Sequence, residues 1–199
     1  MNFVFLATAV VSGLGSIFIL RILYQWLGKF SQRSATDVPP FLQKLDLEYV
    51  NGVFHPEVED GLRQAMQPEE FKEAQWRRIQ LAIHYCMVMS ANAWVIQSWT
   101  VYDRKHNWGV LASGVRQHVK TLRVTCMQCR LAAFMVRLRL HWWIVRMALL
   151  PFAAPPSFKT LLRVGSSDMI EFYEKLREHA AAYSLIYGNE FHDKLMEAF

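Results

Sequence analysis

The sequence predicts an all-α protein: an N-terminal single transmembrane helix followed by a helical bundle of about four main helices, with a long antiparallel hairpin at its centre. Three observations predict it. An uncharged apolar run fills residues 3–20, which is long enough to cross a bilayer. Apolar residues recur at helical spacings of three and four over residues 107–150. Proline and glycine separate the remaining helical stretches, and no stretch alternates convincingly as a strand would.

We expect three parts: a transmembrane anchor over residues 1–30, a linker over 31–40 and a helical-bundle domain over 41–199. Arg21 and Lys29 follow the apolar run, and no basic residue precedes it. The positive-inside rule therefore predicts a single-pass membrane protein with its amino terminus outside and its body in the cytoplasm. A cleavable signal peptide is less favoured, because the basic start and the small-residue cleavage site are both missing.

The helical-bundle domain is expected to begin with short helices over residues 41–50 and 56–67. Pro68 then opens a long helix that we expect to end near Tyr102, and residues 79–102 contain no charged side chain. Such a helix is typical of the centre of a bundle or of a second membrane span. We favour the bundle, because amides such as that of Asn92 are costly in lipid.

The chain is expected to turn at residues 103–107 and to return as a second long helix over residues 107–150. Pro151 ends this helix. After one or two helical turns within residues 157–164, a further helix is expected from Gly165 to Gly188, and a short one over residues 189–199. The two long helices form the central hairpin.

Two apolar stripes with a coiled-coil-like period run along roughly opposite sides of the second long helix, at about 100° of rotation per residue. Seam one comprises Val115, Val119, Leu122, Cys126, Cys129, Ala133, Val136, Leu140, Trp143 and Met147. Seam two comprises Val124, Gln128, Leu131, Met135, Leu138, Trp142, Val145 and Leu149. Each seam requires a neighbour. The bundle supplies both neighbours, or seam two meets a membrane surface or another subunit.

Basic side chains occupy the flanks between the seams. From Arg104 to Ser167 the chain has eleven Lys or Arg and no Asp or Glu, whereas acidic residues predominate in residues 37–75 and 168–199. We expect acidic helices beside this basic one. The alternatives are anionic lipid headgroups and, less favoured, nucleic acid. The candidate partner or lipid interface comprises Arg116, Lys120, Arg123, Arg130, Arg137, Arg139, Trp142 and Arg146.

One cysteine pair invites a metal or redox hypothesis. Cys126 and Cys129 share a helix face and could chelate a metal, with Cys86 and His84 as weak further candidates. The simpler interpretation is that both cysteines fill seam-one positions as small apolar residues. The chain has no Glu-x-x-His spacing, no phosphate-binding glycine loop and no nucleophile elbow. We therefore expect no cofactor and no enzyme.

These patterns favour a membrane-anchored, non-catalytic helical scaffold or accessory subunit of a membrane-associated protein assembly. Its expected partners are the membrane and either other protein subunits or further copies of itself. Two alternatives remain open at this point. One is a binding module that uses the basic flank to bind anionic lipid or, as the less favoured ligand, nucleic acid. The other is a metal or redox protein that uses Cys126 and Cys129.

Overall fold

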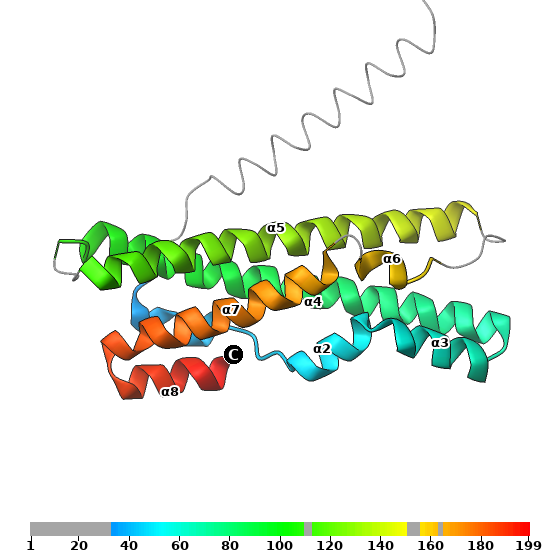
Figure 1. Ribbon diagram of the computed structural model, residues 1–199, viewed down its shortest axis with the longest axis horizontal. Coiled ribbons are helices and arrows are strands. Elements are labelled where there is room, and N and C mark those ends of the chain that lie inside the picture. The colour runs from blue at the N-terminus through cyan, green and yellow to red at the C-terminus, as the bar shows by residue number, and fades with distance from the viewer. Residues whose placement is uncertain (1–32, 110–112, 151–155, 163–164) are drawn as a thin grey trace, which may run out of the picture. The chain divides into compact units, whose positions relative to one another are not determined.

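The computed structural model describes residues 33–109, 113–150, 156–162 and 165–199 (Figure 1). The chain divides into two units, Met1–Gln32 and Arg33–Phe199. The expected transmembrane anchor over residues 1–30 therefore lies outside the described residues. Within the described ranges every regular element is a helix, so the prediction of an all-α fold is confirmed at that level.

Two long helices form the centre of the second unit. Helix α4 (Pro68–His106) and helix α5 (Ser113–Leu149) pack side by side (Figure 1). A buried hydrogen bond from the Arg130 guanidinium to Gln97 Oε1, 2.6 Å long, fixes which residues face each other. A capping box between Gln67 and Glu70 begins α4, because these side chains satisfy backbone N–H groups that have no partner inside the helix.

Helix α4 continues to His106, beyond its expected end near Tyr102. The reason is tertiary. Asp103 was expected in the turn, but it is buried and accepts hydrogen bonds from the Tyr183 hydroxyl at 2.8 Å and from Asn107 Nδ2 at 2.9 Å. These bonds hold the last turn of α4 against a distant helix, which local turn signals cannot reveal.

The first short helix also differs from the prediction. Residues 35–37 and 39–41 form 3-10 turns (Ala35–Asp37 and Pro39–Phe41), and α2 spans Leu47–Phe54. The helix therefore runs through Asn51 and Gly52, beyond its expected end at Val50. The Asp46 side chain caps its first turn by accepting from two backbone N–H groups. Val50, Val53 and Phe54 are buried, and this packing outweighs the low helix propensity of the two residues.

The remaining helices pack against the hairpin or against one another. Helix α3 spans Pro56–Ala65 and packs on α4, as does α2. After the short α6 (Lys159–Leu162), α7 (Ser166–Ser184) runs along α5, and a 3-10 turn (Leu185–Tyr187) leads to α8 (Asn189–Ala198), which folds back on α7 (Figure 1). Gly165 and Gly188 have φ of 101° and 98°, which glycine adopts without strain.

Helix α4 is long and apolar enough to cross a membrane by length and composition. Half of its most apolar 18-residue window is buried by other parts of the protein, and buried helices of soluble bundles share this composition. Its central amide is satisfied within the protein: Asn92 donates to the Gln43 carbonyl at 2.8 Å and contacts the Tyr173 hydroxyl at 2.6 Å. These contacts agree with the expectation that α4 is a bundle helix.

Candidate interaction surface on helix α5

The two seams of α5 have opposite surroundings. Seam one faces α4 and α7: Val119 and Leu140 are completely buried, Met147 is only 8% exposed, and Val115 near the start of α5 is partly exposed. In seam two, Val145 is 43% exposed and Leu149 is 73% exposed. The described residues therefore cover one apolar side of α5 and leave the other uncovered.

Seam two forms an apolar strip. Val124, Leu131, Met135, Leu138 and Trp142 are all between 46% and 60% exposed. From Val124 to Leu149 the strip is about 38 Å long at 1.5 Å per residue. The neighbouring Met127, which the seam-two spacing did not include, is 51% exposed and widens it. Single exposed apolar residues are ordinary, but a continuous strip marks a contact surface.

A shallow hollow lies over the second half of the strip. It has a volume of about 640 Å³. Its wall carries a cation as well as apolar groups, because Arg139 borders it. The described residues that line it all belong to α5: Met135, Leu138, Arg139, His141, Trp142 and Val145.

The basic flanks are divided between surface and interior. Lys120, Arg139 and Arg146 are exposed, and Arg116, Arg123 and Arg137 are partly exposed. Arg130 corrects our prediction, because it is only 6% exposed and points at Gln97 of α4. Burial lowers its pKa from the usual value. Arg130 is therefore a packing residue of the hairpin and is not available to a lipid or protein partner.

Among the described residues, the acidic helices form no ion pair with the exposed Arg139 and Arg146 of α5. Within the described ranges, the ion pairs lie inside or next to α3, α4, α7 and α8, except for Lys159 with Asp60. Arg139 and Arg146 take part in none of them. Seam two therefore keeps a positive border.

The cysteines behave as core residues. Cys86, Cys126 and Cys129 are free and buried, and the Cys86 thiol lies 3.6 Å from Met169 Sδ. His84 is exposed on another side of α4, two residues from Cys86 and thus about 200° around the helix. The four candidate ligands do not converge, and the described part of the chain contains no group of three or more His, Cys, Asp or Glu that could hold a metal.

We expect the thiols of α5 to be unreactive in the folded protein. Burial raises the pKa of Cys129 to about 12 and that of Cys126 well above its ordinary value, and the thiolate is the reactive form. A thiol-specific labelling reagent at pH 8 should modify Cys126 and Cys129 only after denaturation. Because only the unfolded state ionises its thiols above pH 9, unfolding measurements should show stability falling from there toward pH 12. Rapid labelling of native protein would contradict this.

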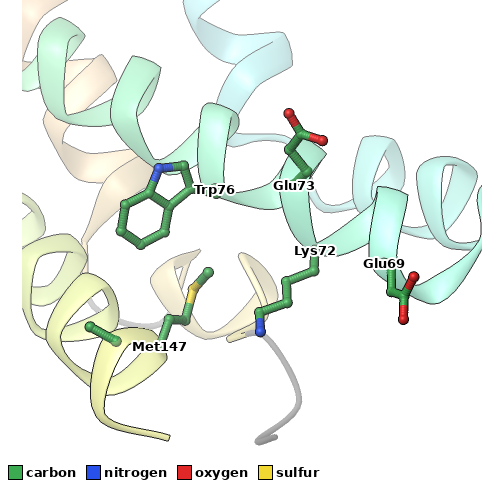
Figure 2. Close-up of a pocket in the computed structure, with 6 residues that line it drawn as sticks. Glu69, Lys72, Glu73, Trp76 and Met147 are labelled. Atoms are coloured by element: carbon green, nitrogen blue, oxygen red, sulfur yellow. The ribbon is translucent and has the colours of Figure 1, made fainter. Parts of the chain in front are cut away.

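A smaller hollow lies at the open end of the hairpin, where α4 begins and α5 ends. It has a volume of about 320 Å³. The described residues that line it are Glu69, Lys72, Glu73 and Trp76 of α4 and Met147 and Ala148 of α5. Figure 2 shows Trp76 and Met147 facing each other, with the carboxylates of Glu69 and Glu73 directed away from them. The residues that line it place no nucleophile beside a base, so the geometry does not suggest an active site.

The described residues thus define an all-helical bundle protein with one uncovered apolar helix face. No protein-family model, no curated protein and no solved structure matches the chain. The function must be inferred from the surface itself.

Proposed function

We propose that the chain is a membrane-anchored, non-catalytic accessory subunit, and that seam two joins its cytoplasmic body to another protein of the same membrane-associated assembly. The observation that carries the proposal is the exposure of seam two, from 43% at Val145 to 73% at Leu149. Burying such a strip against a partner is favourable at about 25 cal/mol per Å² of apolar surface.

The charge along seam two specifies the chemistry of the partner. Arg139 and Arg146 border the strip on one side, and Arg123 and Arg137 lie on the other. A second copy of α5 would bring arginines against arginines, which is unfavourable. The partner that fits is a different protein, with an apolar helix face bordered by Asp or Glu.

The membrane anchor in this proposal is the apolar run over residues 3–20, which has the length of a span. Few residues of sequence separate this run from the body, Arg33–Phe199. Helix α4 is the less suitable anchor, because its polar centre at Asn92 is bonded to other parts of the body.

Site-specific photocrosslinking of the full chain in its native membrane tests the proposal. A photoreactive residue in place of Trp142 should form one defined crosslink, to an apolar helix bordered by acidic residues in another protein. Leu138→Glu should abolish this crosslink, because it places a charge in the strip. Leu185→Glu is the matched control, since Leu185 is 53% exposed and Leu138 is 50% exposed.

Three results would overturn the proposal. A crosslink to the chain itself would indicate self-association, and a crosslink only to lipid would make seam two a membrane-binding face. Equal loss in the Leu138→Glu and Leu185→Glu variants would show that the crosslink does not depend on seam two. Both variants should keep the melting temperature of the wild-type protein, because exposed positions tolerate such changes within about 0.5 kcal/mol.

A further inference from the structure

The turn between α4 and α5 gathers positive charge from both helices. Gln97 bonds to Arg130 across the hairpin, so one heptad further toward the turn Arg104 of α4 stands opposite Arg123 of α5. The pKa of Arg123 is lowered by burial and then by the charge of Arg104, which agrees with this register. Arg104 and Lys120 are exposed, and Arg123 is partly exposed.

These cations have no acidic counterpart in the described ranges. Arg104, Lys120 and Arg123 take part in none of the ion pairs found there. Asp103 is the nearest acid along the chain, but its carboxylate is buried and bonded to Tyr183 and Asn107. Arg123 Nε is buried without a hydrogen-bond acceptor. An external anion would offset the repulsion between the positive charges of Arg104, Lys120 and Arg123.

Arg33, where the second unit begins, packs beside the half of α4 that leads to the turn. The Arg33 guanidinium stacks 3.6 Å from the centre of the Phe41 ring and 5.8 Å from that of Trp94 on α4. Along α4, Trp94 and Arg104 are about 15 Å apart at 1.5 Å per residue.

We propose that the end of α4 and the first turns of α5 bind the phosphate groups of anionic lipid headgroups, through Arg104, Lys120 and Arg123. This inference rests on the proposed membrane anchoring and adds a second contact for the body. The sequence predicted a lipid site along the whole basic flank of α5, whereas the site proposed here uses only the first three turns of α5. It also includes Arg104, which the sequence prediction placed beyond the end of the first long helix.

Lipid is favoured over free phosphate or nucleic acid by the apolar groups beside the cations. Trp108 lies in the turn and the Arg116 guanidinium is 5.7 Å from its ring centre. Val124, next to Arg123, is 55% exposed. Cations beside exposed apolar and aromatic groups fit the headgroup region of a bilayer, where each basic side chain attracts anionic lipid.

The test uses the full chain in a nonionic detergent, titrated with short-chain phosphatidylglycerol or phosphatidylcholine and followed by native mass spectrometry. We expect tighter binding of phosphatidylglycerol. The double variant Arg104→Gln with Arg123→Gln should weaken this binding about thirtyfold, because each lost charge weakens it about fivefold. Arg77→Gln with Lys194→Gln is the matched control, because it removes two exposed charges elsewhere and should bind as the wild type does.

Several outcomes would overturn the inference. Equal affinity for the two lipids, or equal weakening in the control, would remove the site. Competition by glycerol phosphate as strongly as by lipid would indicate a soluble phosphate ligand, and preference for a single-stranded oligonucleotide would indicate nucleic acid. If the double variant melts early, Lys120→Gln at an exposed position replaces it. Leu138→Glu should leave lipid binding intact, so failure here is distinct from failure of the seam-two proposal.

Discussion

Trp99→Ala is expected to lower the free energy of unfolding by about 4 kcal/mol, because it removes a large side chain from the fully packed interior. Trp99 is completely buried. Its ring centre lies 4.8 Å from that of Tyr183 and 5.3 Å from that of Phe191. The substitution therefore loosens α4 from both α7 and α8.

Trp142→Ala provides the matched control. It removes the same side chain from seam two, where Trp142 is 60% exposed, and should change stability by less than about 0.5 kcal/mol. Urea unfolding of the full chain in detergent, followed by circular dichroism, measures both variants. The crosslink to the partner should show the reverse pattern. It should survive in folded Trp99→Ala protein, whose seam two is unchanged. With the photoreactive residue at Met135, Trp142→Ala should weaken it. Similar stability losses in the two variants would contradict the assignment of the two seams.

Periodicity predicted the long helices because spacing along a chain directly determines which side chains share a helix face. It could not decide how many faces have neighbours. Cys126 and Leu131 both occupy apolar positions, yet the first is fully buried and the second is 54% exposed. That difference depends on where α7 packs, which is a property of the whole chain.

The differences from the sequence predictions have a common cause. Asn51 and Gly52 remain helical because Val50 and Val53 are buried beside them. Arg130 resembles the other basic residues of its flank in sequence, but the register of the hairpin directs it at Gln97. Local signals are weaker than packing when the two disagree. The same register places Arg104 opposite Arg123. The sequence alone does not predict this, because it depends on how α4 and α5 pack against each other.

The proposed contacts use different parts of the hairpin. Seam one builds the core, seam two offers an apolar strip with a positive border, and the turn concentrates the cations of both helices. In this proposal, a protein partner and an anionic membrane bind to different parts of the same helix pair.

High salt should weaken lipid binding at the turn more than protein binding at seam two, because screening reduces charge attraction and leaves apolar burial intact.

Glu59→Ala is expected to cost about 3 kcal/mol of stability, because it leaves a buried donor without its charged acceptor. The Glu59 side chain is almost fully buried. Its Oε2 accepts from the Phe158 backbone N–H at 2.7 Å and from the Ser157 hydroxyl at 3.0 Å, and its Oε1 pairs with Arg63 at 3.1 Å. One carboxylate thus joins α3 to the segment before α6.

The consequence reaches α5. Phe158 is completely buried and its ring packs against Trp143 of seam one, with 5.6 Å between ring centres. Releasing Phe158 therefore loosens the end of α5 that carries Val145 and Leu149. Glu57→Ala is the control, because Glu57 is 86% exposed and should have little effect in the same urea experiment. Glu59→Gln retains one acceptor for the Phe158 N–H and should fall between the two. Equal stability of the two alanine variants would show that α5 is held at this end by apolar packing alone.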